Sequence, residues 1–434
     1  MVKISNARLA NGNLVNIEIS NGLISKVDKA TAGKVTDGID AKSKLIIPGL
    51  VDLHTHLREP GREDAETVLT GSRSAVAGGY TAVSAMANTN PVADNAGVVE
   101  QIYRLGKSAG LVDVNPIGAV TKGLLGEQLA EMGAMADSIA RVRIFSDDGK
   151  CVFDPLIMRR ALEYVKTFNG IIAQHAQEPR LTVNAQMNEG VISARIGLPG
   201  WPAIAEEAII ARDILLAEHV QSRLHICHVT TAGGVELIRW AKQRGIQVTA
   251  EVTPHHLLLT DELVENYDPI YKVNPPLRTE KDVQALREGL AEGVIDVVAT
   301  DHAPHPSEDK DCEFQAGAFG MVGLETALSV VVKTMIETKL MTWSDLIDRM
   351  SIAPARIAGY TNQGNEVAVG NSANLILIDQ DRKWRVDRDK LKSKSKNTPF
   401  NGMELPSVIT DVFHNGDHVL QDSLVVDKKS SSNE

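Results

Sequence analysis

The stretch LHICHVTTAGGVELIRWAKQRGIQVTA, residues 224–250, contains one complete strand–helix–strand repeat. Residues 224–227 form a short apolar run typical of a buried strand, and Thr231 can cap the helix that follows. Gly245 ends this helix, and a second apolar run begins at residues 246–250. Buried strands that alternate with helices in this way predict a parallel sheet.

The same alternation extends over the middle of the chain. Further apolar runs predict strands at 80–85, 170–173 and 295–300, and helical periodicity predicts helices at 155–168 and 281–292. Roughly 290 residues of such units suit a (β/α)8 barrel of the TIM type. A doubly wound open sheet is the alternative, but no GxGxxG motif follows the first strand.

The two ends of the chain have a different texture. Short alternating runs are separated by Asn-Gly turns at residues 11–12, 21–22 and 415–416, which indicate β-hairpins. We therefore expect three regions, a small β-sandwich domain formed by 1–48 together with 365–425, a barrel domain at 49–364 and a disordered tail at 426–434.

Composition and charge narrow the class of protein. Acidic residues exceed basic ones, 56 against 45, and the net charge of −11 disfavours a nucleic-acid surface. The one basic run, residues 382–396, is expected to be a solvated loop without a function.

The three cysteines form no CxxC pair, which favours reduced thiols. No secretion signal or membrane-spanning stretch is evident, so we expect a cytoplasmic protein without a membrane partner.

Metal-ligand residues stand where the predicted strands end. His54 and His56 follow the strand predicted at 45–52, and their i and i+2 spacing places both imidazoles on one face. Four further predicted strand ends each supply one candidate ligand: Asp148, His175, His228 and Asp301. Each of these residues alone would more often be a buried histidine or a turn aspartate. Together they form a mixed nitrogen and oxygen set suited to zinc, and six ligands favour two ions that share a carboxylate.

Several motifs resemble those of the dihydroorotases, specifically the longer bacterial class I type within the amidohydrolase superfamily. The motifs are HTHLR at 54–58, Asn88-Thr89, NPPLR at 274–278, TDHAPH at 300–305 and FGMVGLET at 319–326. The resemblance covers nearly the whole chain. It implies an enzyme that interconverts dihydroorotate and N-carbamoyl-L-aspartate, a step of pyrimidine synthesis.

The resemblance also implies how the ligands are shared. One zinc ion is expected on His54, His56 and Asp301, the other on His175 and His228, with Asp148 as the bridge. Many relatives bridge their metals with a carboxylated lysine, whereas class I dihydroorotases use an aspartate. Asp147 is the less favoured choice for this bridge, and some members of the class carry a single metal.

The substrate contacts and the mechanism follow from the same resemblance. It assigns Arg58, Asn88 and His305 to the substrate carboxylate, Asn274 to the ring, and Phe319 and Gly320 to further contacts. A guanidinium two residues beyond a metal ligand is a sensible fork for a carboxylate. A hydroxide shared by the zinc ions would attack the ring amide, and Asp301 would act as the general acid and base.

Two alternative functions stay open from the sequence. A hydantoinase or allantoinase would share the fold and metals, but Arg58 and His305 would then meet no carboxylate. A non-catalytic partner of aspartate transcarbamoylase would not need a complete ligand set. Dependence of an active enzyme on that transcarbamoylase, and a homodimer, are further candidate associations. Residues 306–317 are either a mobile lid or an exposed loop, and Cys312 within them is expected to pack rather than react.

Overall fold

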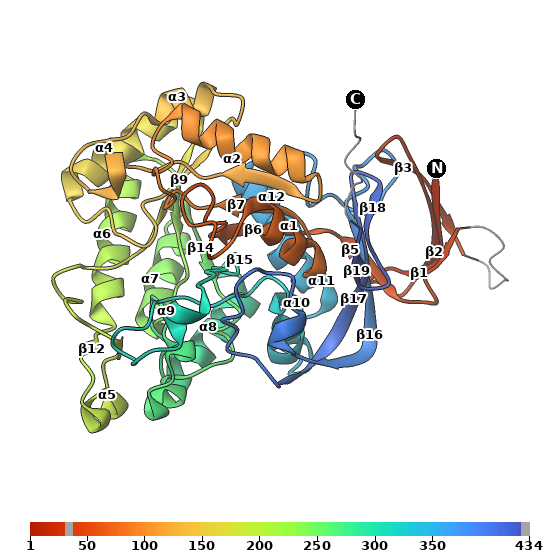
Figure 1. Cartoon of the computed structure of the whole chain (residues 1–434). Helices are drawn as coiled ribbons and strands as arrows, with labels where there is room; N and C mark the ends of the chain where they lie inside the picture. Colours follow the sequence, from red (N-terminus) through yellow and green to blue (C-terminus); the bar gives the residue numbers. More distant parts are fainter. Residues whose placement is uncertain (31–37, 427–434) are drawn as a thin grey trace.

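The centre of the molecule holds two sheets of parallel strands (Figure 1). The computed structural model describes residues 1–30 and 38–426. One sheet has the order β6 (Leu50–Thr55), β7 (Tyr80–Ala85) and β8 (Asp113–Pro116). The other has the order β15 (Val297–Val298), β14 (Val248–Val252), β13 (Leu224–Ile226), β10 (Ile171–Gln174) and β9 (Ile144–Phe145). Almost every residue of these strands is buried, as expected for a parallel sheet that is covered on both faces.

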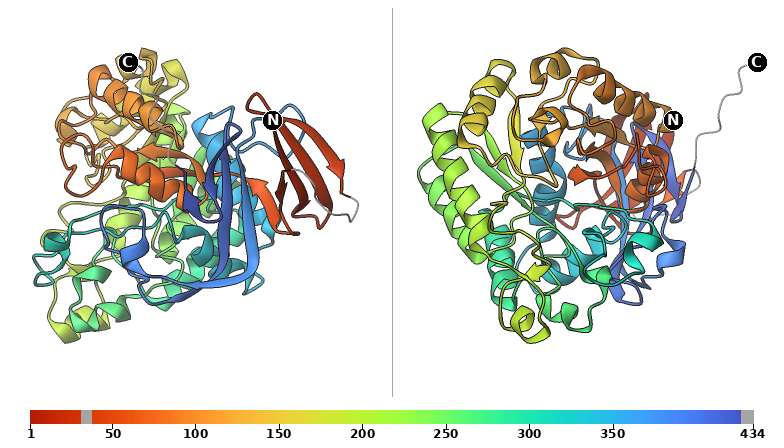
Figure 2. Two further views of the ribbon diagram at one scale, coloured as in Figure 1. Left: turned by 45° about the vertical axis from the view of Figure 1, so that its right-hand side comes forward. Right: turned by 60° about the vertical axis from the view of Figure 1, so that its left-hand side comes forward.

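Single parallel bridges connect the edges of these two sheets. Gly118, just beyond β8, pairs with Phe145 of β9, and Thr55 at the end of β6 pairs with His302, just beyond β15. Helices that follow the strands along the chain lie around the outside (Figure 2). They are α1 (Val68–Ala77), α2 (Ala96–Ala109), α4 (Pro155–Val165), α6 (Ile204–Val220), α7 (Ala232–Gln243) and α8 (Glu280–Glu292). The predicted α/β alternation is therefore confirmed.

Helix α7 illustrates how the local sequence sets these boundaries. Its N-cap is Thr231, whose side chain accepts a hydrogen bond from the N–H of Gly234. The buried face carries Val235, Ile238 and Ala241, which follow one another at spacings of three residues. The helix therefore packs this face inward, beside the strand β14 that follows it along the chain.

Shorter elements fill the connections. The short strands and α-helices are β11 (Met187–Asn188), β12 (Gly200–Trp201), α3 (Met132–Asp137), α5 (Val191–Ile196), α9 (Ser307–Lys310), α10 (Ala327–Val331), α11 (Trp343–Ile347) and α12 (Ala353–Ala358). The 3-10 and π-helical turns are η1 (Lys122–Leu124), η2 (Lys166–Phe168), η3 (Asp261–Asn266), η4 (Pro269–Tyr271), η5 (Val332–Ile336), η6 (Asp348–Ile352) and η7 (Arg388–Lys390). No helix in the described ranges has the length and apolar content needed to span a bilayer.

Both ends of the chain meet in a separate sheet of mixed strand direction at one side of the molecule (Figure 1). Its strands are β1 (Val2–Arg8), β2 (Leu14–Ser20), β3 (Leu23–Lys29), β4 (Ile39–Asp40), β5 (Leu45–Pro48), β16 (Leu375–Arg385), β17 (Glu404–His414), β18 (Asp417–Gln421) and β19 (Leu424–Val425). The two ends join where β5 pairs antiparallel with β16. These strands form one hydrogen-bonded sheet, so the sandwich arrangement stays a prediction. Apart from Val426, the predicted tail lies outside the described residues.

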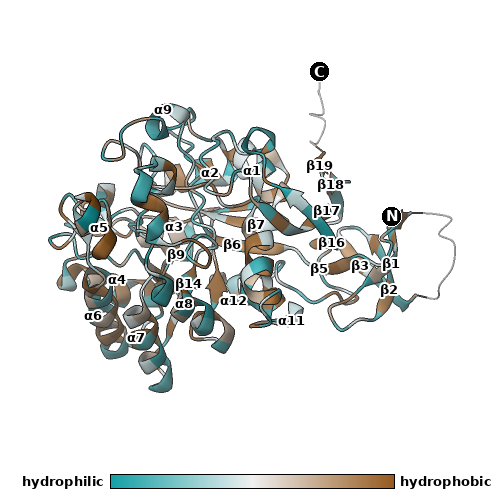
Figure 3. Ribbon diagram, turned by 90° about the horizontal axis from the view of Figure 1, so that it is seen from below, coloured by the Kyte–Doolittle hydropathy of each residue, from teal (hydrophilic) through white to brown (hydrophobic). Residues whose placement is uncertain are grey.

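The hairpins of this mixed sheet form at the predicted turns. Asn21 and Gly22 have φ values of 51° and 78°, and Asn415 and Gly416 have φ values of 50° and 83°. Two successive residues with positive φ match the twist of the flanking strands, and Asn-Gly is the pair that adopts this conformation most readily. Figure 3 shows the mixed sheet beside the helical part, whose inner strands β6, β7 and β14 carry mainly apolar residues.

The single strand predicted at 45–52 is wrong, because the chain changes sheet at Gly49. β5 before it pairs antiparallel with β16, and β6 after it pairs parallel with β7. The Gly49 N–H donates to the carbonyl of Asn374, and its own carbonyl accepts from the Ser351 hydroxyl. A Cβ at this position would lie 2.3 Å from side-chain atoms of Thr81, so only glycine fits this crossing.

Candidate metal centre

All six predicted metal ligands lie in one buried cluster. They lie at or just beyond the carboxyl ends of five parallel strands, β6, β9, β10, β13 and β15. The six residues are each at most 5% exposed, and they are His54, His56, Asp148, His175, His228 and Asp301. Their donor atoms form two overlapping groups, His54 with His56 and Asp148, and Asp148 with His175 and His228. Asp148 is the member common to both groups.

The two oxygens of Asp148 point to different histidine pairs. Its Oδ2 lies 3.3 Å from the Nε2 atoms of both His54 and His56. Its Oδ1 lies 3.3 Å from Nδ1 of His175 and 3.2 Å from Nε2 of His228. Although burial would raise its pKa, the charge of His54 and hydrogen bonds from the surrounding histidines hold the pKa of Asp148 well below its usual range. The carboxylate therefore stays ionised between the two pairs.

Asp301 completes the group around the first histidine pair. Its Oδ1 lies 2.9 Å from Nε2 of His56 and 3.5 Å from Nε2 of His54. Burial opposes ionisation, yet the two histidines lower the pKa of Asp301 to about 2. Asp301 and His228 both adopt positive φ, 46° and 31°, a strained conformation that is typical of functional sites.

Partners outside the cluster orient three of the imidazole rings. Nδ1 of His54 lies 2.6 Å from Oε1 of Glu251, and Nδ1 of His56 lies 2.9 Å from Oδ1 of Asn88. Nε2 of His175 lies 2.8 Å from Oε1 of Gln177. Each bond places a ring proton on the outer nitrogen, so the inner nitrogen faces the cluster and is the atom that could bind a metal.

Sequence reasoning missed Glu251 and Gln177. A carboxylate inside the otherwise apolar run of β14 was the signal for Glu251, because a buried charge needs partners. Gln177 lies two residues after His175, in a segment without a recognisable pattern.

The donor set suits a metal centre. Nε2 of His54 is buried and has no hydrogen-bond partner. Nδ1 of His175 and Nε2 of His228 lie 2.9 Å apart and both face Asp148. A buried nitrogen atom without a hydrogen-bond partner, such as Nε2 of His54, is costly unless a cation lies beside it. Four imidazoles and two carboxylates also form a donor set typical of divalent transition metals.

Asp147 faces away from this cluster. Its Oδ1 accepts hydrogen bonds from the N–H groups of Val120 and Thr121, at 2.8 and 3.0 Å. Burial raises the pKa of Asp147 to about 6. Its bonds hold the segment after β8 in place.

The predicted substrate contacts fall into two sets beside the ligands. Arg58, which is partly buried, lies with one terminal nitrogen 3.4 Å from Nε2 of His305, and that Nε2 lies 2.8 Å from the carbonyl of Phe319. Gly320 follows with φ of 143°, and a Cβ there would lie 2.9 Å from the His305 ring. Arg58, His305, Phe319 and Gly320 thus lie together.

Asn88 and Asn274 instead contact the ligand histidines, Asn88 directly and Asn274 through Gln177. Asn88 bonds to His56, and Nδ2 of Asn274 lies 3.4 Å from Oε1 of Gln177. Oδ1 of Asn274 is buried without a partner, so it is available to a bound molecule.

Comparison with known proteins identifies the family. A family model described as dihydro-orotase-like matches residues 43–233. Dihydroorotase from Streptomyces coelicolor is 62% identical over 419 residues, which cover 96% of this chain and 98% of that protein. The chain belongs to the dihydroorotase family. Dihydroorotase from Mycobacterium tuberculosis is 53% identical and covers 95% of this chain and 96% of its own length. The family predicted from the motifs is confirmed, and the chain is an enzyme that hydrolyses cyclic amides in pyrimidine biosynthesis.

Solved structures support the fold. L-Hydantoinase (dihydropyrimidinase) from Arthrobacter aurescens superimposes with a TM-score of 0.86 and 25% identity, over 98% of this chain and 97% of that one. A D-hydantoinase structure matches with a TM-score of 0.81 at 21% identity, covering 98% of this chain and 96% of its own, a likeness of fold alone.

Proposed function

We propose that this chain is a class I dihydroorotase of the amidohydrolase superfamily, acting in the cytoplasm. It interconverts (S)-dihydroorotate and N-carbamoyl-L-aspartate in de novo pyrimidine biosynthesis. The observation that carries the proposal is the position of Asp148, whose two oxygens face two separate histidine pairs beside Arg58 and His305. This arrangement suits a binuclear hydrolase for a cyclic amide that carries a carboxylate.

We assign the donor atoms to two zinc ions. His54, His56 and Asp301 would hold one ion, His175 and His228 the other, and Asp148 would bridge them. Zinc bound there supplies Lewis acidity, which activates water and polarises the ring carbonyl.

The side chains around the ligands bind the substrate and move its proton. Arg58 offers a guanidinium to the carboxylate, and burial lowers its pKa only to about 10, so it stays charged at neutral pH. His305 and Asn88 complete this contact, and Asn274 meets the ring. In hydrolysis the oxygen of water joins the amide carbon and the ring C–N bond breaks. Asp301 takes the proton of that water and returns it to the leaving nitrogen.

The finer fold assignment is part of the proposal. The edge bridges from Gly118 to Phe145 and from Thr55 to His302 support the closure of the eight parallel strands into a (β/α)8 barrel. The terminal strands would form a small β-sandwich domain. Association with aspartate transcarbamoylase and a homodimer stay predictions from the sequence.

One other activity is favoured by a specific observation. The structural likeness to an L-hydantoinase is high, so a hydantoinase-type activity is the second candidate. Hydantoins carry no carboxylate, however, and would leave Arg58 and His305 without a partner.

The proposal is tested by metal removal and substrate turnover. Chelation should abolish hydrolysis of dihydroorotate, and added zinc should restore it. His54→Ala should fold but lose turnover by orders of magnitude, because it removes a ligand and little core volume. Full turnover by a metal-free preparation contradicts the metal assignment. Hydrolysis of hydantoin as efficiently as dihydroorotate would instead favour the second candidate.

A further inference from the structure

A segment from the mixed sheet reaches the loops that carry the proposed substrate contacts. Residues 391–398, here called the crossing segment, lie between β16 and β17. Its side chains alternate between buried and exposed positions. Ser393, Ser395 and Asn397 are buried, while Lys392 and Lys394 are exposed. The solvated loop expected for the basic run is therefore wrong for this part. The lysines face solvent, and the small polar side chains between them face the protein.

Two acidic side chains, the buried Glu66 and the partly buried Glu325, fix the crossing segment. Glu66 accepts from the Ser393 hydroxyl and, at 3.0 Å, from the Lys394 N–H. The same carboxylate lies 3.3 Å from Nε2 of His302, the neighbour of a proposed metal ligand. Glu325 accepts from the Ser393 N–H at 3.0 Å. The segment is thus tied to the barrel side of the molecule just before Asn397.

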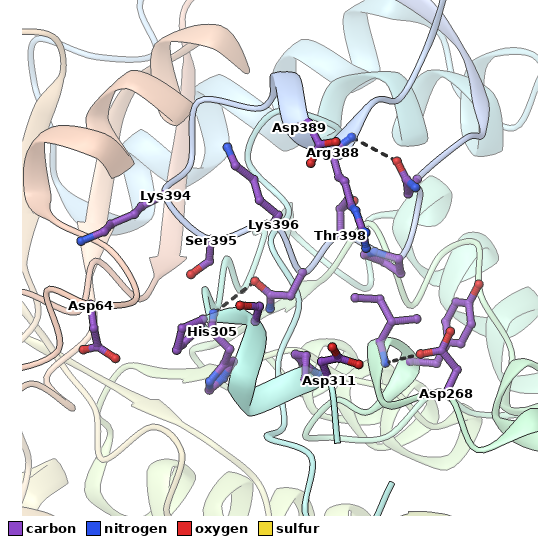
Figure 4. A pocket seen from close by; sticks show the side chains of 18 residues that line it. Asp64, Asp268, His305, Asp311, Arg388, Asp389, Lys394, Ser395, Lys396 and Thr398 are labelled. Carbon is purple, nitrogen blue, oxygen red and sulfur yellow. Dashed lines mark hydrogen bonds between the residues drawn. The ribbon is translucent and has the colours of Figure 1, made fainter. Parts of the chain in front are cut away.

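Asn397 uses its whole amide to connect two loops. Its Oδ1 accepts from the His305 N–H at 3.1 Å, a bond marked at His305 in Figure 4. Its Nδ2 donates to the carbonyl of Ala303 at 3.0 Å and to that of Gly320 at 3.2 Å. The residue is only 4% exposed, although it borders a cavity of about 740 Å³ that His305 also lines. Both carbonyls and the N–H belong to the loops that carry His305 and Phe319.

We propose that Asn397 is a positioning residue for recognition of the substrate carboxylate. It sets the distance between the His305 loop and the Phe319–Gly320 loop, which the bond from His305 Nε2 to the Phe319 carbonyl also spans. The inference rests on the proposed function, in which His305 contacts that carboxylate. Asn397 itself touches no reacting atom. Its loss should displace His305 relative to Arg58, and misplacement of this kind costs roughly 10- to 100-fold in kcat/KM.

The test compares Asn397→Ala and Asn397→Asp with Lys392→Ala, an exposed neighbour on the same segment. The aspartate variant keeps the size and one acceptor oxygen but replaces the two donated bonds with repulsion from two carbonyls. Both Asn397 variants should retain zinc and lower kcat/KM for dihydroorotate by about 10-fold or more, chiefly through KM. Lys392→Ala should match the wild type. If Asn397→Ala does not fold, Asn397→Asp carries the test.

A double-mutant cycle separates positioning from general stability. In a His305→Ala background, Asn397→Asp should lower kcat/KM for dihydroorotate by less than about a further 2-fold, because its effect passes through His305. Independent, multiplicative losses in the two backgrounds would overturn the inference, as would wild-type kinetics of Asn397→Asp. Either result leaves the proposed function intact. A wild-type enzyme without dihydroorotate turnover would instead refute the proposed function itself.

Discussion

Nδ1 of His54 lies 2.6 Å from Oε1 of Glu251, and both side chains are almost completely buried. Burial disfavours the ionised carboxylate, but the charge of His54 and bonds from His54 and His225 hold the pKa of Glu251 below its usual range. The ionised Glu251 can only accept, so His54 carries a proton on Nδ1, and Nε2 is the ring nitrogen that faces Asp148. Glu251 thus sets the orientation of a proposed ligand without contacting the metal.

Glu251→Gln should therefore weaken zinc binding while the protein still folds. Loss of such an outer partner lowers metal affinity by roughly 10- to 100-fold. Competition with a chelator of known affinity measures the change. Asp113→Asn, which alters a buried carboxylate of another hydrogen-bond network, is the matched control and should keep the wild-type affinity. Equal affinities for wild type and Glu251→Gln would show that His54 needs no such partner.

The two neighbouring aspartates should separate metal binding from stability. Asp148→Ala should lose zinc from the site of His175 and His228, because it removes the oxygen that faces both. Asp147→Ala should keep zinc but destabilise the fold by about 1–3 kcal/mol, since two buried N–H groups lose their acceptor. Metal analysis and urea unfolding of both variants give the answer. The reverse pattern would mean that Asp147 is the bridge.

The sequence predicts the fold well where a local pattern is enough. The Thr231 cap and the Asn21-Gly22 turn depend on residues only a few positions apart, so a short stretch of sequence predicts them. The break at Gly49 is not readable in this way, because 45–51 is uniformly apolar and only pairing with β16 and β7 divides it. β5 and β16 lie more than 300 residues apart along the chain, so their pairing leaves no mark in a short window of sequence.

The candidate site shows the same division. The ligands His54 and Asp301 were found because parallel strands bring their carboxyl ends to one edge. Glu251 lies inside a strand and was missed, since it acts through a ligand on another strand. Asn397 directly follows the charged run 382–396 that looks solvated, and its role depends on where the chain crosses between sheets.

Asp113 should make stability depend on pH in the acid range. It accepts from Gln363 at 2.8 Å and Asn362 at 2.9 Å, and lies 3.5 Å from Nε2 of His414 on β17. Burial would raise its pKa, but the bond and charge of His414 lower the pKa of Asp113 below its ordinary value of 3.8. A lowered pKa means that the folded state prefers the ionised form. This stabilisation is fully present above the unfolded-state pKa and is lost as pH falls through the folded-state value.

Asp113→Asn should accordingly lower the free energy of unfolding by about 1–3 kcal/mol at pH 7. The difference from wild type should shrink as the pH falls below about 4. Urea unfolding at a series of pH values measures both. Asp64→Asn, at an exposed carboxylate, serves as the control and should change little. A difference that stays constant down to pH 3 would refute the linkage.

Arg58 should decide which cyclic amide the enzyme prefers. It lies two residues after His56 with a positive φ of 63°, and it donates from Nε to the carbonyl of Pro304 at 3.1 Å, so its guanidinium is held beside His305. Dihydrouracil is dihydroorotate without the carboxylate. A site built to pair a polar group rejects the analogue that lacks it by roughly 10⁴ or more, because its own donors are left unpaired. Arg58→Met should therefore collapse kcat/KM for dihydroorotate, keep zinc content and change the slow rate on dihydrouracil little.

The control is Arg62→Met, at an exposed arginine four residues further along the chain, and it should behave as wild type. If Arg58→Met lowers both rates equally, Arg58 supports the loop rather than recognising the carboxylate.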